Sequence, residues 1–495
     1  MKKNNKSKKE RLKTGAPGLD DVLNGGLISN RLYLVEGDPG SGKTTLALQF
    51  LLEGLKQREN CLYVTLSETK EELSAGAESH GWSLDGLKIV ELIPDAKELN
   101  GETRVTMYHP SEVELSETTK RVLDAVEKIN PRRIVFDSLS EVRLLAQSPL
   151  RYRRQILALK QFFIGRQCSV LLLDDGTSEG PDLQLHSIAH GVISLEQLSP
   201  GYGPARRRLR VLKFRGTDFR GGYHDFRIQH GGLVVFPRLL AIEHSESFEP
   251  GQVKSGVTAL DALLGGGPDR GTSTLLMGPA GSGKSTIAVQ YIVAAAERDE
   301  HTAIFAFDES TATLAARTEA LGIKFKECWK AGQVNFQQVN PAELSPGEFA
   351  YLVRQSVEND HARVILIDSL NGYMNAMPEE RFLTVHLHEL LAYLGRKGVT
   401  TLMVVAQHGL IGSNMHSAFD TSYLADSVIL LRYFEYAGKV KKAISVVKKR
   451  SGRHEESIRE LRFDKKGIHL SEPLTQFRGI MTGTLVELKP EKGES

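Results

Sequence analysis

The stretch Gly37-Asp38-Pro39-Gly40-Ser41-Gly42-Lys43-Thr44 fits the pattern G-x-x-x-x-G-K-[ST] in full. It stands between residues 31–36, a short apolar run typical of a strand, and residues 45–52, which have helical spacing. Glycines allow successive backbone N–H groups to turn toward an anion, and the helix N-terminus adds its dipole. The stretch therefore predicts a phosphate-binding loop and a parallel-sheet domain built around it. The residues expected to contact the nucleotide are Gly40, Ser41, Gly42, Lys43, Thr44 and Thr45, with Thr44 also suited to Mg²⁺.

The same pattern returns in the second half of the chain as Gly278-Pro279-Ala280-Gly281-Ser282-Gly283-Lys284-Ser285. A strand-like run again precedes it and a helix-like run follows it. The match extends outward, because residues 18–26 pair with residues 258–266. Two copies of one domain explain this repetition. The second set of expected nucleotide contacts is Gly281, Ser282, Gly283, Lys284, Ser285 and Thr286, with Ser285 as the Mg²⁺ ligand.

Length and composition agree with two domains of ordinary size. The chain has 495 residues, of which 40% are hydrophobic. We expect a basic, disordered tail over 1–11, a first domain over 12–240, a linker over 241–251 that is rich in polar and breaker residues, a second domain over 252–472, and a polar tail over 473–495. The formal net charge of +2 gives no global attraction to nucleic acid or membranes.

Three cysteines without C-x-x-C spacing favour a reducing compartment and argue against zinc. The sequence contains no apolar run of about 18 residues and no secretory signal at its start. We therefore expect a soluble cytoplasmic protein without a membrane span.

Strand-like and helix-like runs alternate in each half, which predicts an α/β fold with a mostly parallel sheet flanked by helices. After residue 174 the pattern changes. Residues 191–195 and 207–214 look like strands without helices between them, and residues 427–431 and 442–448 repeat this in the second half. A small antiparallel extension of each sheet is therefore expected.

Acidic residues close several of the apolar strands. Asp137 and Asp368 each end a run that should neighbour the phosphate-loop strand, where a carboxylate could hold the hydration shell of Mg²⁺. A simple strand-end cap is the alternative interpretation. The recurrence of this aspartate at matching places in both halves favours the metal role.

Phosphoryl transfer also needs a carboxylate that orients or deprotonates the attacking group. Glu68 stands at the tip of the second strand of the first copy, and Asp308 and Glu309 stand adjacent in the second copy. Strand ends are often acidic simply because they reach water. The matched position in both repeats favours a catalytic role for these three residues.

Together these residues resemble the KaiC family of RecA-like clock ATPases and autokinases, over nearly the whole chain. The tandem phosphate loops, Gly18-Leu19-Asp20, the acidic strand ends and the run from Val428 to Arg450 carry the resemblance. It implies two tandem RecA-like domains, Mg-dependent ATP hydrolysis in signalling or circadian-type timing, and a homohexamer of two stacked rings with ATP at each subunit boundary. It also implies trans-acting basic residues from the neighbouring subunit, which match Lys213, Arg215, Lys448 and Arg450.

The sequence departs from the KaiC pattern in three places. Where KaiC has two adjacent glutamates the first copy has Ser67 and Glu68, so Glu68 would act alone. The Ser-Thr pair that KaiC phosphorylates falls on Ser422 and Tyr423, which leaves Ser422 as the candidate acceptor of Ser/Thr autokinase activity or as a plain polar residue. The short, diverged segment 479–495 argues against a KaiA-like partner, whereas a KaiB-like regulator remains compatible with the resemblance.

Two other classes of protein fit the same motifs. A RecA- or RadA-like DNA-dependent ATPase in repair or recombination would share the fold, and residues 201–208, rich in Gly and Arg, are the candidate DNA-facing loop. A solvated hairpin tip is the other interpretation of that loop, and nucleic acid is not the partner we expect. The third class is a non-catalytic, nucleotide-gated scaffold, which Ser67 makes conceivable for the first copy.

Overall fold

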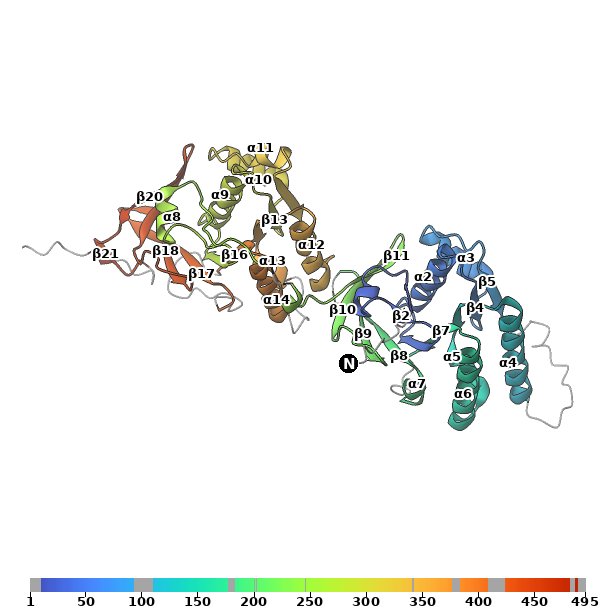
Figure 1. Ribbon diagram of the computed structural model, residues 1–495. Helices are drawn as coiled ribbons and strands as arrows, with labels where there is room; N and C mark the ends of the chain where they lie inside the picture. The colour runs from blue at the N-terminus through green and yellow to red at the C-terminus, as the bar shows by residue number, and fades with distance from the viewer. Residues whose placement is uncertain are drawn as a thin grey trace, which may run out of the picture. The chain divides into compact units, whose positions relative to one another are not determined.

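The computed structural model describes residues 10–92, 110–176, 183–199, 201, 203–244, 246–340, 342–375, 383–407, 423–480 and 486–487. The chain divides into two compact units, Met1–Arg238 and Leu239–Ser495. Each unit is built on its own nine-stranded sheet (Figure 1).

The first unit alternates strands and helices and then ends in four consecutive strands of its main sheet. Its elements are β1 (Arg11–Leu12), α1 (Leu19–Val22), β2 (Leu27–Ile28), β3 (Leu32–Gly37), α2 (Lys43–Lys56), β4 (Cys61–Thr65), α3 (Lys70–Ser79), β5 (Lys88–Glu91), α4 (Pro110–Ile129), β6 (Arg133–Asp137), α5 (Leu139–Ala146), α6 (Pro149–Gly165), β7 (Ser169–Asp175), α7 (Leu183–Ile188), β8 (Gly191–Leu198), β9 (Arg206–Phe214), β10 (Tyr223–Gln229) and β11 (Gly232–Phe236).

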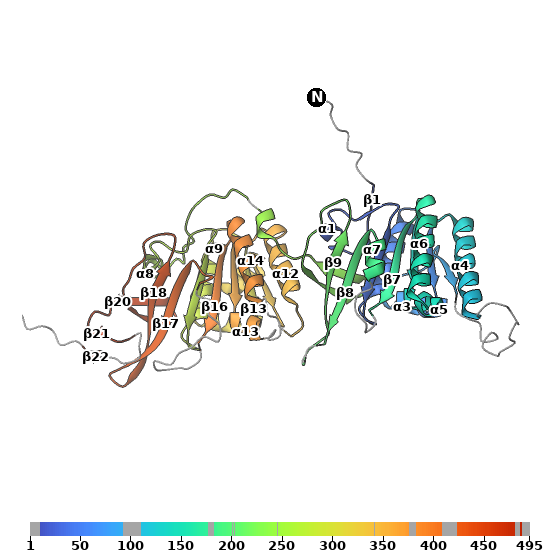
Figure 2. The same cartoon turned by 90° about the horizontal axis from the view of Figure 1, so that it is seen from below.

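The strand order of this sheet is β11-β10-β9-β8-β3-β7-β6-β4-β5. Neighbouring strands in the run β8-β3-β7-β6-β4-β5 are parallel. Strands β9, β10 and β11 extend the sheet beyond β8 with antiparallel pairing. Successive side chains of a strand point to opposite faces, so Val135 of β6 packs with α2 while Ile134 and Phe136 pack with α4 and α6. Helices therefore cover both faces of the parallel part (Figures 1 and 2).

The second unit repeats this plan with two more short strands near its end. Its elements are η2 (Ala241–Glu243), α8 (Thr258–Leu263), β12 (Ser273–Gly278), α9 (Lys284–Ala296), β13 (Thr302–Ala306), α10 (Thr311–Glu319), α11 (Phe325–Lys330), β14 (Val334–Gln338), α12 (Pro346–Glu358), β15 (Val364–Asp368), α13 (Leu370–Asn375), α14 (Leu383–Arg396), β16 (Thr400–Ala406), β17 (Ser427–Tyr436), β18 (Lys439–Lys449), β19 (Arg459–Asp464), β20 (Gly467–Pro473), β21 (Phe477–Arg478) and β22 (Val486–Glu487).

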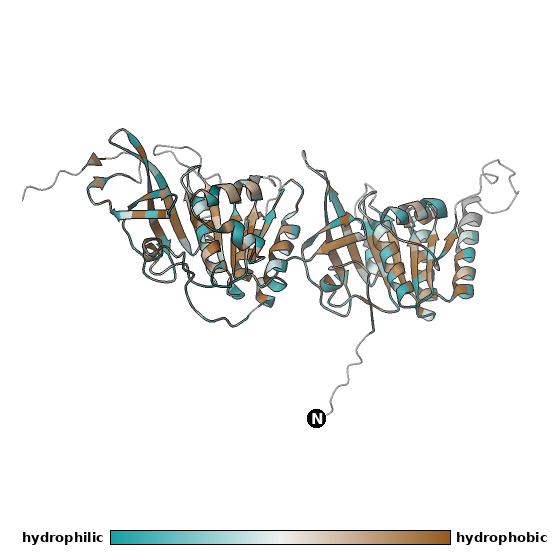
Figure 3. Ribbon diagram, turned by 90° about the horizontal axis from the view of Figure 1, so that it is seen from above, coloured by the Kyte–Doolittle hydropathy of each residue, from teal (hydrophilic) through white to brown (hydrophobic). Residues whose placement is uncertain are grey.

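The strand order of the second sheet is β14-β13-β15-β16-β12-β17-β18-β19-β20. Read from the opposite end, it is the order of the first sheet strand for strand, with β12 in the place of β3. Figure 3 shows apolar strands inside both units and helices with polar outer faces. The expected fold class, two tandem RecA-like α/β domains with a small antiparallel extension, is confirmed.

Residues near both ends of the second unit are packed where the sequence analysis expects a linker and a tail. Leu239 and Ala241 are buried in the core that also contains α12 and α14, so the predicted linker of 241–251 begins inside the second unit. The predicted tail from 473 onward is also partly packed, because Ile480 is buried beside Phe434 and the Phe477 ring contacts Tyr436. In both places a few apolar side chains have long-range partners that local composition does not reveal.

Candidate nucleotide-binding sites

Both phosphate loops lie at the carboxyl end of the strand that the sequence predicted. The first connects β3 to α2, and the second connects β12 to α9. Gly42 and Gly283 cap the two helices with φ of 102° and 107°, in the left-handed region that favours glycine. A Cβ on Gly42 would lie 2.7 Å from Ile228, and one on Gly283 would lie 2.3 Å from Phe463. Side chains of the antiparallel extension therefore lie against each loop, and together with the left-handed φ they favour glycine at these two positions.

The side chains of the two loop lysines donate hydrogen bonds to carbonyls of their own loops. Lys43 donates to the Gly37 carbonyl at 2.7 Å, and Lys284 donates to the Pro279 carbonyl at 2.7 Å. Their charged neighbours differ. Lys43 forms an ion pair with Asp175 at 2.9 Å, whereas burial lowers the pKa of Lys284 to about 8 although nearby Asp368 favours its charged form. The two sites are therefore electrostatically different.

Each loop also contains a serine that fits a phosphate ligand. Ser41 and Ser282 are completely buried, and within the described ranges their hydroxyl oxygens have no hydrogen-bond partner. Buried polar groups are usually paired, so an unpaired hydroxyl at the same place in both loops calls for a ligand atom. A phosphate oxygen beside the inward-turned backbone N–H groups meets that need, and the loops fit a nucleotide.

The candidate metal ligands come together in both units. Thr44 donates a long hydrogen bond of 3.4 Å to Asp137, and a hydrogen bond from Ser285 stabilises the charged form of Asp368. Burial raises the pKa of both aspartates, against the opposing hydrogen bond that Tyr63 donates to Asp137 at 2.5 Å.

A hydroxyl and a carboxylate in this arrangement suit Mg²⁺, which prefers oxygen ligands and usually keeps waters and substrate phosphates. Among the described residues no three His, Cys, Asp or Glu side chains gather to hold a metal alone.

Glu68 lies near the first phosphate loop and is half-buried. Its main chain is fixed by the buried Thr65 hydroxyl, which donates to the Glu68 carbonyl at 2.7 Å and accepts from the Glu68 N–H at 3.0 Å. Burial, and then the negative charges of Asp137 and Glu72, raise the pKa of the Glu68 carboxyl. A carboxylate of raised pKa close to the metal-site aspartate is suited to accept a proton.

Asp308 and Glu309 are adjacent in sequence but face different partners. Asp308 accepts a hydrogen bond from Ser369 at 2.8 Å, at the start of the segment that follows β15. Glu309 instead binds the Arg317 guanidinium of α10 through both carboxylate oxygens. Its charge also acts on Asp368, which places Glu309 close to the second metal site.

Two residues of these sites were missed by the sequence reasoning. Asp175 lies directly after residue 174, where the sequence pattern changes, and the register places it opposite Gly37. Burial would raise the pKa of Asp175, but Lys43 and Ser140 lower it below its usual value. The pairing of the two parallel strands, had it been predicted, would have placed Asp175 beside the start of the phosphate loop. Arg317 belongs to no recognisable sequence motif. Only the structure shows that it contacts Glu309 and Thr286.

The four candidate trans-acting side chains contact main-chain carbonyls of their own unit. Lys213 donates to the His186 carbonyl, and Arg215 donates to the Ser187 carbonyl at 3.1 Å. In the second unit, Lys448 donates to the Ala425 carbonyl at 2.7 Å, and Arg450 donates to the Tyr423 carbonyl at 3.0 Å. Each pair thus contacts the segment just before β8 or β17, and the structure does not bring them to the phosphate loop of their own unit.

The candidate phosphoacceptor Ser422 lies outside the described residues. So do residues 1–9 of the predicted basic tail and most of the segment after Ile480. Tyr423, which replaces the second acceptor of the family pattern, is described and is 53% exposed.

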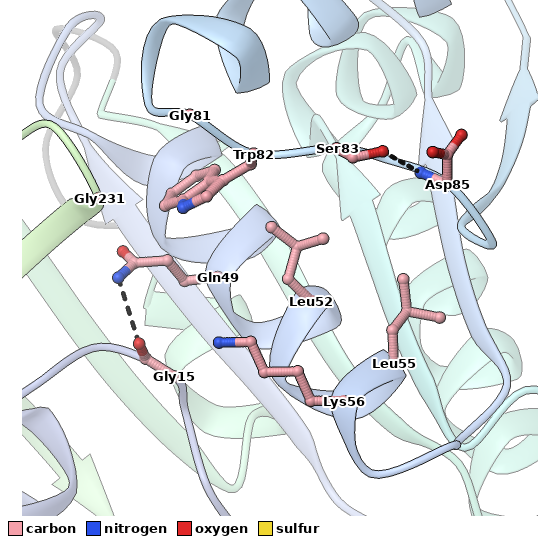
Figure 4. A pocket seen from close by; sticks show the side chains of 10 residues that line it. All are labelled: Gly15, Gln49, Leu52, Leu55, Lys56, Gly81, Trp82, Ser83, Asp85 and Gly231. Atoms are coloured by element: carbon pink, nitrogen blue, oxygen red, sulfur yellow. Dashed lines mark hydrogen bonds between the residues drawn. The ribbon is translucent and has the colours of Figure 1, made fainter.

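A separate pocket of about 450 Å³ lies beside the C-terminal half of α2, lined by Trp82, Lys56 and Asp85 among others (Figure 4). The Gln49 amide in its wall donates to the carbonyls of Gly15 and Leu233 and accepts from the Leu233 N–H. This amide therefore holds β11 to α2, and we assign the pocket no ligand.

Two RecA-like sheets, each with a glycine-rich phosphate loop and a hydroxyl–aspartate pair beside it, define a tandem P-loop ATPase. The chain belongs to the KaiC ATPase family, whose description, "ATPase: KaiC", matches residues 12–239 and 253–475. Membership of this family implies that the chain binds ATP.

Curated relatives are similar over nearly their whole length. The chain is 26% identical over 482 residues to "Circadian clock protein KaiC3" of Synechocystis sp., covering 96% of this chain and 94% of that protein. It is 26% identical over 485 residues to "Circadian clock oscillator protein KaiC" of Synechococcus elongatus, covering 96% and 91%. In the part of the chain that the structure describes, no helix is long and apolar enough to cross a membrane.

Proposed function

We propose that this protein is a cytoplasmic, Mg-dependent ATPase with two non-equivalent sites, which acts in signalling or circadian-type timing. The observation that supports this best is the duplication of the site. Each loop combines a buried lysine with a buried serine hydroxyl that has no hydrogen-bond partner among the described residues, and each has a hydroxyl–aspartate pair beside it. A scaffold that binds nucleotide without hydrolysing it would not need Glu68 or Glu309 close to the metal-site aspartates.

In the proposed reaction, a water oxygen attacks the γ-phosphorus, the bond to the β-phosphate oxygen breaks, and the water proton passes to a carboxylate. Glu68 takes that role in the first site and Glu309 in the second. Lys43 and Lys284 neutralise the outer phosphates. Thr44 and Asp137 in the first site, and Ser285 and Asp368 in the second, would hold Mg²⁺, which would offset the negative charge that develops during the reaction.

Self-association is the second part of the proposal. Lys213, Arg215, Lys448 and Arg450 would leave their carbonyl partners and contact ATP on a neighbouring copy, in a homohexamer with nucleotide at the subunit boundaries. This part follows the similarity to KaiC proteins. A KaiB-like regulator remains part of the proposal, and a KaiA-like partner does not.

Autokinase activity at Ser422 is proposed as a slow side reaction, with Asp308 as its base. Aspartate is one methylene shorter than the glutamate of the family pattern, which sets its carboxylate about 1.5 Å further back, the length of one C–C bond. The hydrogen bond from Ser369 also holds Asp308 to its own chain. Mapping of phosphate after incubation with labelled ATP tests this: modified Ser422 that disappears in Asp308→Asn supports the proposal, and an unmodified chain that turns over ATP contradicts it.

A DNA-dependent ATPase is not supported by the basic strand β9. Arg208 forms an ion pair with Glu196 at 2.8 Å and stacks on Tyr223, and Arg210 lies 3.6 Å from the same glutamate. This charge is partly neutralised within the chain, whereas phosphate-backbone binding needs available cations.

Two measurements test the proposed function. Native mass spectrometry should show hexamers with ATP and smaller species when both Lys43 and Lys284 are replaced by alanine, because a ligand at a boundary stabilises association. ATP hydrolysis should not respond to single-stranded DNA. Strong stimulation by DNA, or hexamers that persist in the double variant, would contradict it.

A further inference from the structure

Arg317 of α10 joins two groups of the second site that belong to different elements. Its Nε donates to Glu309 Oε1 at 3.0 Å, and its Nη2 donates to Glu309 Oε2 at 2.8 Å. Its Nη1 donates to the Thr286 hydroxyl at 2.7 Å, in the first turn of α9. Arg317 and Glu309 are 30% and 23% exposed, so this contact is partly shielded from water.

The first site has counterparts for both partners but not for the arginine. Glu68 and Thr45 stand where Glu309 and Thr286 stand in the second copy, counted from the helix caps Thr69 and Ser310 and from the loop lysines. Gly76 occupies the place of Arg317, and a Cβ there would have no described atom within 4 Å. The first site instead fixes the main chain of Glu68 through the Thr65 hydroxyl, and Ala306 takes the place of Thr65 in the second site.

We propose that Arg317 is a positioning residue for ATP hydrolysis in the second site, in the place of the contact that Thr65 makes in the first. It holds the Glu309 carboxylate at a fixed distance from the phosphate-loop helix. This inference rests on the proposed function, in which Glu309 is the catalytic carboxylate.

The contact leaves both partners able to act. A carboxylate offers about four lone-pair sites, and the guanidinium fork takes one on each oxygen, so each oxygen can still accept a hydrogen bond from water. Thr286 accepts from Arg317 through its oxygen and keeps its own hydrogen to donate to a phosphate. The arrangement therefore orients Glu309 rather than consuming it, and it ties the carboxylate to the helix that carries the phosphates.

The test isolates the second site with Glu68→Gln and adds Arg317→Ala, Arg317→Lys or Glu309→Gln to the full-length chain. Because misplacement by about 1 Å can cost on the order of 10²-fold, we expect Arg317→Ala to lower kcat at least tenfold with KM changed less than threefold. Arg317→Lys should recover part of the rate, since one ammonium cannot replace the planar fork. The matched control is Arg354→Ala on α12, which removes an Arg–Glu pair of the same unit.

Combined variants separate the failure of this inference from the failure of the proposed function. If Glu309→Gln leaves the rate unchanged, the catalytic role of Glu309 is wrong. If Glu309→Gln lowers the rate but Arg317→Ala does not, or raises it, only the positioning role is overturned. When Arg317 acts through Glu309, the double variant should be no slower than Glu309→Gln alone, because residues in one network are not additive.

A rescue in the first site tests the inference from the other side. In a chain whose second site is silenced by Glu309→Gln, Thr65→Ala should lower turnover, and Gly76→Arg should restore part of it. A first site that Gly76→Arg fails to rescue would overturn the equivalence of the two contacts. Circular dichroism and thermal unfolding confirm that each variant is folded, which the outer position of Arg317 on α10 favours.

Discussion

The ion pair between Lys43 and Asp175 should weaken ATP binding at the first site. The substitution Asp175→Asn should therefore strengthen ATP binding there. Lys43 must exchange this carboxylate for phosphate oxygens when ATP binds. At the observed 2.9 Å the gross attraction is about 6 kcal/mol with an effective dielectric constant of about 20. Asp175 is 32% exposed, and measured pairs of this kind keep only about 1 kcal/mol after screening and desolvation.

A loss of about 1 kcal/mol of competing interaction corresponds to roughly fivefold tighter binding. The assay is titration of a fluorescent ATP analogue into a chain whose second site is silenced by Lys284→Ala. Asp85→Asn is the matched control, since it removes the same charge from the same unit in the pocket of Figure 4. The reciprocal change, Ala406→Asp, places a carboxylate at the equivalent register of the second site and should weaken binding there.

Unchanged or weaker binding in Asp175→Asn would refute the competition between carboxylate and phosphate. The residue would then serve ATP binding, for example through the hydrogen bond that it accepts from Ser140.

Three further predictions concern the two units separately. In a chain whose first site is silenced by Lys43→Ala, ATP affinity at the second site should fall as the pH rises through about 8. Burial lowers the pKa of Lys284 to about 8, and bound phosphates require its charged form. An affinity that stays constant in analogue titrations between pH 7 and 9 would contradict this. Gly283→Ala should lower ATP affinity at the second site at least about tenfold, because alanine disfavours the left-handed φ of this position and its Cβ would clash with Phe463. Gly76→Ala is the control: no described atom lies within 4 Å of a Cβ there, so ATP affinity at the first site should not change. Arg133→Met should destabilise the first unit by about 2–4 kcal/mol in urea unfolding, since the fully buried guanidinium would no longer donate to the partly buried Glu59 or to the carbonyls of Lys13 and Phe50. Surface Arg166→Met is the control, and equal stabilities of the two variants would argue against a structural role for the buried Arg133.

The fold was predictable because its signals are local. Both phosphate loops follow apolar runs, and the runs that end at Asp137 and Asp368 are buried on both faces, as central parallel strands are. The antiparallel extension was visible as consecutive strands without helices. The burial of Leu239 and Ala241 could not be predicted, because it depends on helices far along the chain.

The core of each site was predictable for a related reason. The carboxyl ends of parallel strands meet at one edge of a sheet, so the strand-end acids had to lie near the loops. Arg317 could not be found in this way, because its contact with Glu309 depends on how α10 packs near α9. Lys213 and Arg215 show the same limit, since the sequence places them on a strand but does not fix where their long side chains point.

The central claim is that both phosphate loops bind and hydrolyse ATP, and steady-state hydrolysis by four chains tests it most directly. These are the unaltered protein, Lys43→Ala, Lys284→Ala and the double variant. The account predicts that each single variant loses part of the turnover and that the double variant loses nearly all of it. A double variant that hydrolyses ATP at the rate of the unaltered protein would contradict the account.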